Sequence, residues 1–210
     1  EYLFENHITS DENHVYEGVR ELFRVLNYDS NNFGTREWNP LGHIIRPGMK
    51  VIIKPNFVLS RHKERKNLFS IITHPSVIRA VADYCLIALR GTGSLVIADA
   101  PQYDCNFEEL LDETNLNEVV DFYKRHKRPS VELFDLRTYW SMHKHFTSML
   151  IPLPGDPEGS ANVNIGARSH LYKHPNPDNF YGAVYHRDEV ISHHKDDCQE
   201  YEVSKTILSA

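Results

Sequence analysis

Apolar runs and helical patterns alternate along the chain up to residue 137. Two short apolar runs, residues 51–53 and 95–98, are typical of strands buried on both faces, as in a parallel sheet. Residues 131–134 are predicted to form a third strand. Before and between them, apolar residues recur at the spacing of an amphipathic helix. The helical patterns cover residues 10–27 and 75–90, and two shorter ones begin at Asn106 and Asn115. The alternation predicts an α/β domain with a mostly parallel sheet flanked by helices.

Capping residues mark the expected helix ends. Thr9 and Glu12 have the spacing of a capping box, which predicts a helix start at Ser10. Pro75 suits the first position of a later helix, because its missing N–H costs little there. Gly91 is placed to end that helix in the left-handed conformation.

The pattern changes after Arg137, where helical spacing fades and turn residues become frequent. A turn cluster at residues 154–159 separates two strand-like stretches, 149–151 and 161–165, and predicts a hairpin between them. Two further stretches with the composition of short strands are residues 181–185 and 189–191. We therefore expect an antiparallel β insertion in the C-terminal third.

The length of 210 residues fits one domain with a full core. We expect a single α/β domain over residues 1–210, with its core at about 10–137. The β-rich, histidine-rich insertion then covers about residues 138–203.

Polar residues follow the first predicted strand at its carboxyl end. Pro55 cannot donate to a ladder, so the strand ends near it and places Lys54 and Asn56 at this end. Ligands of open α/β sheets bind at that edge. We expect Lys54 and Asn56 to hold an anionic group, with Lys54 and His74 as catalytic candidates and Thr73 as a further substrate-binding residue.

A basic loop follows this strand. Residues 61–67 read RHKERKN, in which Glu64 is the only acidic residue. Together with a helix that starts at Pro75, these charges favour a carboxylate or phosphate, and Arg61 is the loop residue expected to bind substrate. A solvated loop without a ligand is the alternative.

Carboxylates follow the other predicted strands. Asp99 ends the second strand, where side-by-side parallel strands would bring it to the edge that holds Lys54. Asp99 with Asp104 can hold a divalent metal, act as acid and base, bind substrate, or pair with Lys54. The alternative is that Asp99 caps its own turn. Asp135 and Arg137 end the third strand, where they either line the same crevice or form a local ion pair.

Histidines and aspartates are frequent in the C-terminal third. His186 and His193 are further metal candidates, because imidazole nitrogen binds zinc and other transition metals. Adjacent His193 and His194 would point to opposite faces of a strand, so both cannot easily bind one ion. Exposed polar histidines on a β insertion are the alternative.

Composition narrows the expected partners. A net charge of −6 with a pI near 6.1 argues against a general nucleic-acid binder. No apolar run reaches the ~20 residues that span a membrane, so we expect no membrane partner. Cys85, Cys105 and Cys198 are scattered without a CxxC pair, so there is no iron–sulfur ligand motif, and free thiols suit a reducing cytoplasm. The expected partner is an anionic small molecule, while cofactor and oligomeric state stay open.

Several motifs in order resemble the domain of unknown function 362 (DUF362) family of bacterial and archaeal proteins. They are IIKPNFV, THPSVIRAVADY, IADAPQYDCNF, VELFDLR, LPGDPEG and EYEVSKTIL. The resemblance implies an α/β domain and no assigned reaction, and some relatives carry an added iron–sulfur module. It also implies a further strand and a lysine-rich segment after Ala210, so we expect the chain to be truncated there.

Three hypotheses about function follow. The first is a cytoplasmic small-molecule enzyme that binds a carboxylate- or phosphate-bearing substrate at the strand ends, with a divalent metal as one option. The second is a non-catalytic domain that binds a metabolite or a partner in the same crevice. The third is a redox-associated protein whose cluster module lies outside residues 1–210.

Overall fold

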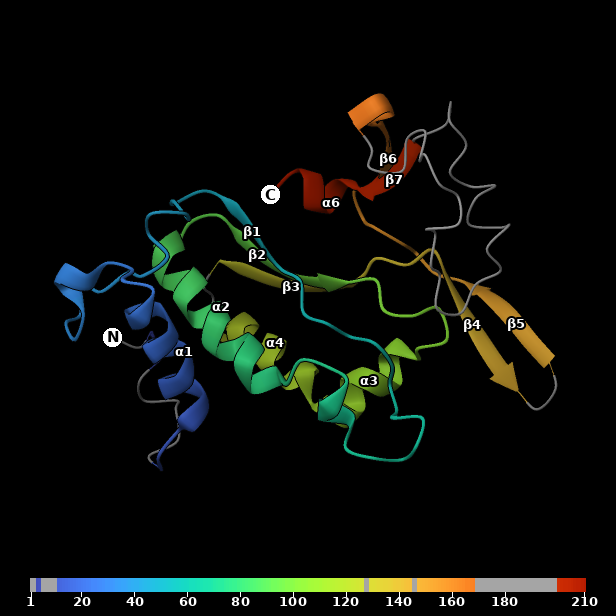
Figure 1. The fold of residues 1–210 in the computed structure, drawn as a ribbon, viewed down its shortest axis with the longest axis horizontal. Helices are drawn as coiled ribbons and strands as arrows, with labels where there is room; N and C mark the ends of the chain where they lie inside the picture. The colour runs from blue at the N-terminus through green and yellow to red at the C-terminus, as the bar shows by residue number, and fades with distance from the viewer. Residues whose placement is uncertain (1–2, 5–10, 127–128, 145–146, 169–199) are drawn as a thin grey trace. The chain divides into compact units, whose positions relative to one another are not determined.

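The computed structural model describes residues 3–4, 11–126, 129–144, 147–168 and 200–210. The chain divides into two compact units, one of residues Glu1–Pro157 with Ser209–Ala210 and the other of residues Glu158–Leu208. The first unit holds the parallel sheet and its helices (Figure 1). The expectation of a single domain with a core at about 10–137 stays a prediction.

Three parallel strands form the sheet of the first unit. They are β1 (Lys50–Ile53), β2 (Ser94–Asp99) and β3 (Ser130–Asp135), in the order β1-β2-β3. Ile53 pairs in register with Ile97, and Asp99 with Asp135. β2 is the middle strand and is buried from Leu95 onward, whereas β1 is only half-buried. The prediction that residues 51–53 are buried on both faces was therefore wrong, because Val51, Ile52 and Ile53 are each only half-buried on this strand at the edge of the described sheet.

Four helices accompany this sheet. They are α1 (His14–Val25), α2 (Pro75–Leu89), α3 (Phe107–Thr114) and α4 (Leu116–Arg125). Figure 1 shows α2 and α4 along one face of the sheet, and α1 packs against α2. The predicted α/β class with a parallel sheet is thus confirmed. The helix expected from Ser10 begins instead at His14, because the side chain of Asn13 caps it by accepting from the Tyr16 N–H at 3.2 Å.

A buried polar cluster joins three of these helices. The Asp83 carboxylate on α2 accepts hydrogen bonds from the hydroxyl of Tyr16 on α1, at 2.5 Å, and from that of Tyr123 on α4, at 2.6 Å. All three residues are at most 5% exposed. Burial raises the pKa of Asp83, although the two hydroxyls oppose this shift by stabilising its charge.

Antiparallel pairs follow the parallel sheet, as predicted for the C-terminal third. β4 (Tyr139–Lys144) pairs with β5 (Thr147–Pro152) in the first unit. In the second unit β6 (Ser160–Asn164) pairs with β7 (Glu200–Ser204), which α6 (Lys205–Leu208) follows. The predicted hairpin between residues 149–151 and 161–165 was wrong, since each stretch pairs with a different strand. The strands expected at residues 181–185 and 189–191 lie outside the described residues.

Within the described ranges, no helix is both long enough and apolar enough to cross a membrane.

Candidate functional site

Lys54 and Asp99 meet at the carboxyl edge of β1 and β2, where the sequence placed them. The Lys54 Nζ lies 2.7 Å from Asp99 Oδ1, and the Phe57 N–H donates to Asp99 Oδ2 at 2.8 Å. The Asp99 side chain is 4% exposed, whereas that of Lys54 is 59% exposed. The carboxylate is therefore held from both sides, while the ammonium keeps N–H groups that face solvent. The catalytic roles expected for these residues stay predictions.

Asn56 and Thr73 join the two ends of the loop that contains the basic residues. The Asn56 N–H donates to Thr73 Oγ1 and the Thr73 N–H donates to the Asn56 carbonyl, both at 2.9 Å. Phe57 and Ile72 form an antiparallel bridge just inside this pair. We call the closed segment the 58–71 loop. The Thr73 hydroxyl already serves the backbone, whereas the Asn56 side chain is exposed and donates only a long 3.4 Å bond to the Ile71 carbonyl.

His74 is the N-cap of α2. Its Nδ1 accepts from the Ser76 N–H at 3.1 Å and lies 2.7 Å from the Ser76 hydroxyl. The ring also packs on Phe69, with centroids 4.1 Å apart. This arrangement leaves Nε2 as the ring nitrogen available to a ligand. A catalytic role for His74 stays a prediction.

Arg61 lies at the base of the 58–71 loop and forms an ion pair with Glu109 on α3. The Ser60 hydroxyl donates to the same carboxylate at 2.8 Å, and Ser60 is buried. Glu109 therefore anchors the loop to α3. Because Arg61 is already paired with Glu109, its contacts fit a structural role as well as the substrate-binding role that we expected.

Asp104 lies on the exit from β2 and is half-buried. Among the described residues, no group of three or more histidine, cysteine, aspartate or glutamate side chains is placed to hold a metal ion. His186 and His193 lie outside the described residues. Metal binding by Asp99, Asp104 or these histidines therefore stays a prediction.

A cavity of about 450 Å³ lies between the 58–71 loop and the loop that follows β2. Val58, Leu59 and Ile71 give it an apolar side, and His62, Lys63, Glu64, Lys66 and Gln102 give it a polar one. Lys66 pairs with Glu64, but Lys63 has no ion-pair partner among the described residues. The cavity thus combines an apolar surface with an unneutralised ammonium.

The cavity lies just beyond the carboxyl ends of β1 and β2. Val58 comes four residues after Lys54, Gln102 comes three residues after Asp99, and the Gln102 N–H donates to the Val58 carbonyl at 3.2 Å. Four residues of chain span at most about 14 Å. Lys63 belongs to the predicted basic loop, whereas Gln102 was not among the predicted site residues, although its position just beyond a strand-ending aspartate was a usable signal.

Arg137 binds the backbone of the loop that follows β2. It forms a two-pronged ion pair with Asp135, with Nη2 2.6 Å from Oδ2 and Nε 2.9 Å from Oδ1. Its Nη1 donates to the carbonyls of Gln102 and Cys105, at 2.7 and 2.9 Å. Of the two interpretations that the sequence left open, the local ion pair is the one observed. Its effect is to fix the loop that carries Gln102.

Cys105 is fully buried next to this arginine. Burial raises the pKa of its thiol to about 12, although the positive charge of Arg137 opposes the shift. The protonated thiol is a poor nucleophile at neutral pH. Cys105 is therefore a packing residue of the site.

These features define an α/β domain whose charged and polar residues gather where parallel strands end. The model of the family described as "Domain of unknown function (DUF362)" matches residues 51–152, from β1 through β5. The match covers this segment of the chain, and the predicted resemblance to the DUF362 family is confirmed. Four of the six motifs lie within the match, and LPGDPEG and EYEVSKTIL lie beyond it. Neither the curated proteins nor the solved structures contain a significant match to the chain.

Proposed function

We propose that this domain binds a small carboxylate- or phosphate-bearing molecule at the carboxyl edge of β1 and β2. The observation that carries the proposal is the Lys54 ammonium, held 2.7 Å from the buried Asp99 carboxylate and yet more than half exposed. Holding the side chain in place reduces the rotamer entropy that a flexible lysine would lose on binding. The proposal makes Lys54 the primary contact of the anion.

Asp99 has the role of a positioning residue in this proposal. One of its oxygens accepts from Lys54 and the other from the Phe57 N–H. A general base needs an oxygen that faces the substrate. The contacts of Asp99 therefore support a binding function for this edge more strongly than acid–base catalysis.

The neighbouring cavity accounts for the rest of the ligand. Its volume of about 450 Å³ lies within the usual range of roughly 300–1,000 Å³ for small-molecule sites. Val58, Leu59 and Ile71 suit an apolar portion, and Lys63 offers a second cation. A metabolite with one apolar end and one or two anionic groups fits this distribution.

Isothermal titration calorimetry against inorganic phosphate, phosphomonoesters and di- and tricarboxylates tests the proposal, each with and without Mg²⁺. We expect binding that weakens as ionic strength rises. A charge-assisted hydrogen bond contributes about 1.5–3 kcal/mol, so Lys54→Met should weaken binding by roughly tenfold or more. Lys124→Met is the matched control, because Lys124 is similarly exposed and pairs only with Asp121 on α4.

Lys54→Met leaves the buried Asp99 carboxylate without its cation, so the free energy of unfolding must be measured in parallel. Combining Lys54→Met with Asp99→Asn removes the unpaired buried charge, and this double variant should still fail to bind the anion. Failure of every anion to bind the parent protein would refute the proposal. Equal binding by Lys54→Met and Lys124→Met would refute the role of Lys54.

A further inference from the structure

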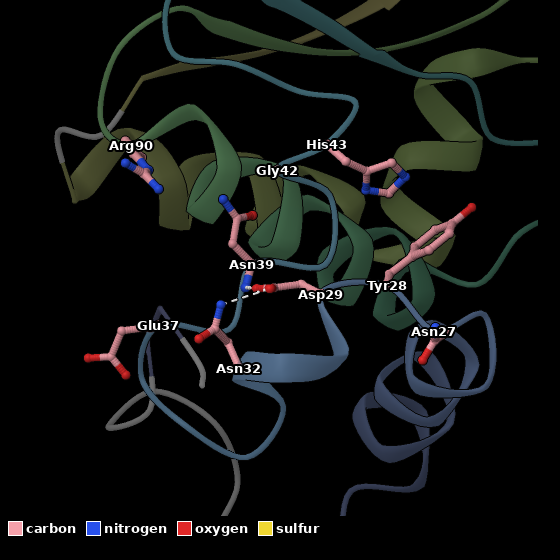
Figure 2. Close-up of a pocket in the computed structure, with 9 residues that line it drawn as sticks. All are labelled: Asn27, Tyr28, Asp29, Asn32, Glu37, Asn39, Gly42, His43 and Arg90. Atoms are coloured by element: carbon pink, nitrogen blue, oxygen red, sulfur yellow. Dashed lines mark hydrogen bonds between the residues drawn. The ribbon is translucent and has the colours of Figure 1, made fainter.

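A second and larger cavity lies at the opposite end of α2. Its volume is about 670 Å³, and its walls come from residues 27–43 together with Arg90 (Figure 2). Arg90 is the C-cap of α2, whereas His74 is the N-cap. The 15 residues of this helix extend about 22 Å, so this cavity is separate from the anion site.

One wall of the cavity is fixed by hydrogen bonds. The Asp29 carboxylate accepts from Asn32 Nδ2 at 2.8 Å and from the Asn39 N–H at 2.7 Å. The Tyr28 carbonyl accepts from Nε1 of the fully buried Trp38 at 3.0 Å, and the Tyr28 ring packs edge-on against His43. The cavity is therefore formed before any ligand arrives, which lowers the entropy cost of binding.

Backbone strain is concentrated around this cavity. Five non-glycine residues in the described ranges have positive φ, and three of them, Asn27, Asp29 and Arg90, line the cavity. Asparagine and aspartate tolerate this conformation. Arginine at φ +49° is strained, whereas glycine at the same position would not be. The arginine at this position is accounted for if its side chain has a role.

Asn39 lines the cavity and carries an unused acceptor. Its Oδ1 is buried without a hydrogen-bond partner among the described residues. The side-chain amide also occupies the space beside Gly42, where a Cβ would lie 2.4 Å from Asn39 Nδ2. Buried acceptors are rarely left unpaired, so a ligand with an N–H or O–H donor would satisfy this group once the Asn39 side chain turned toward the cavity.

Two opposite charges complete the wall. Neither the Arg90 guanidinium nor the Glu37 carboxylate has an ion-pair partner among the described residues. In the view of Figure 2 both lie on one side of Asn39, and Tyr28 and His43 lie on the other. The lining thus offers one site for a carboxylate, one for a cation, and an aromatic surface.

We infer that this cavity binds a small zwitterion of the amino-acid type. Arg90 takes the carboxylate in a two-pronged contact, for which the guanidinium is well shaped. The ammonium donates to Asn39 Oδ1 and is balanced by Glu37, and the side chain of the ligand packs toward Tyr28 and His43. A ligand with only one charge would leave one of these side chains without a partner.

Calorimetry with the 210-residue chain tests the inference. The probes are the common L-amino acids, each compared with its decarboxylated amine and its deaminated acid, and glucose as a polyol. At least one amino acid should bind, and loss of either charged group should weaken it tenfold or more. Binding of glucose or of a singly charged analogue with equal affinity would overturn the inference, as would no binding of any amino acid.

Arg90→Gly separates binding from folding. Glycine favours the positive φ of this position, so the variant should have a Tm no lower than the parent and should lose amino-acid binding at least tenfold. Arg125→Gln on the exposed end of α4 is the control and should bind as the parent does. Unchanged affinity in Arg90→Gly would overturn the role of Arg90. Lys54→Met should leave amino-acid binding intact, so failure of the anion site does not affect this test.

Discussion

Substituting Arg137 with methionine should be among the most destabilising changes at the edge of the sheet. The Arg137 side chain is 7% exposed and its partner Asp135 is 14% exposed. Methionine fills much of the same volume but removes the ion pair and both hydrogen bonds to the carbonyls of Gln102 and Cys105. The Asp135 carboxylate would then lose its cation and keep the hydrogen bond from the backbone N–H of residue 137, and the Gln102 carbonyl would keep the bond from the Cys105 N–H. The Cys105 carbonyl would lose the guanidinium that it accepts from.

The magnitude follows from these contacts. Removing one partner of a buried ion pair costs about 3–5 kcal/mol, because the other charge stays buried without compensation. A domain of this kind has a total stability of about 5–15 kcal/mol, so the loss should be plain in a urea titration. Adding Asp135→Asn removes the stranded charge, and the double variant should retain mainly the cost of the unsatisfied Cys105 carbonyl, about 1–3 kcal/mol.

Urea unfolding followed by far-UV circular dichroism measures the free energy, and amide hydrogen exchange reports on residues 100–106. We expect faster exchange in this segment for Arg137→Met, since Arg137 holds its carbonyls. Arg125→Met, at an exposed position on α4, should change stability by less than about 0.5 kcal/mol. A loss below about 1 kcal/mol for Arg137→Met, with unchanged exchange, would show that the buried-pair reasoning fails here.

Three further predictions concern buried groups and one tight turn. Burial holds the folded pKa of Asp83 above its unfolded value, so its stabilisation is complete below the unfolded pKa and declines as pH rises through the folded one. Asp83→Asn, which cannot ionise, should show a smaller fall in unfolding free energy from about pH 4 to pH 8, and parallel curves would contradict this. Gly93 has φ +92°, and a Cβ there would lie 2.2 Å from the Met49 carbonyl oxygen, so Gly93→Ala should cost at least about 2 kcal/mol in urea unfolding. Burial raises the pKa of the Cys85 and Cys105 thiols to about 12, so peptide mapping should find both alkylated by iodoacetamide only after denaturation; rapid labelling of the native chain would argue against their burial.

The meeting of Lys54 and Asp99 could be predicted because it depends on a general property of parallel sheets. Each residue follows an apolar run, and the carboxyl ends of neighbouring parallel strands share one edge. No atomic detail was needed for that step. The burial of Asp99 and its bond to the Phe57 N–H were beyond the sequence, because they depend on how the chain turns after Pro55.

The strand pairing of the C-terminal third could not be predicted in the same way. Residues 139–144 read YWSMHK and have no regular alternation of apolar and polar positions, yet they pair with 147–152. The segment 160–164 finds its partner at 200–204, far along the chain. Local patterns identify strand-like stretches, but partner choice depends on contacts that the patterns do not contain.

The cavity lined by residues 27–43 was hidden for a different reason. This segment has no hydrophobic periodicity, so its sequence predicts only a loop. Its shape depends on left-handed residues such as Asn27 and Asp29 and on the contact between Asn39 and Gly42. Composition alone does not reveal such geometry.

The hydrogen bonds between Asn56 and Thr73 close the 58–71 loop at its base, so the loop can vary in sequence while the rest of the fold is unchanged. Its two stems meet at one point, so its tip can lengthen, shorten or change charge while the strand before it and the helix after it keep their positions. Relatives that share the sheet could therefore differ in what they recognise through this excursion alone. If the proposed anion site is correct, grafting the tip of this loop from one relative onto another would transfer preference for a ligand, provided that the contacts of Ser60 and Arg61 with Glu109 are kept.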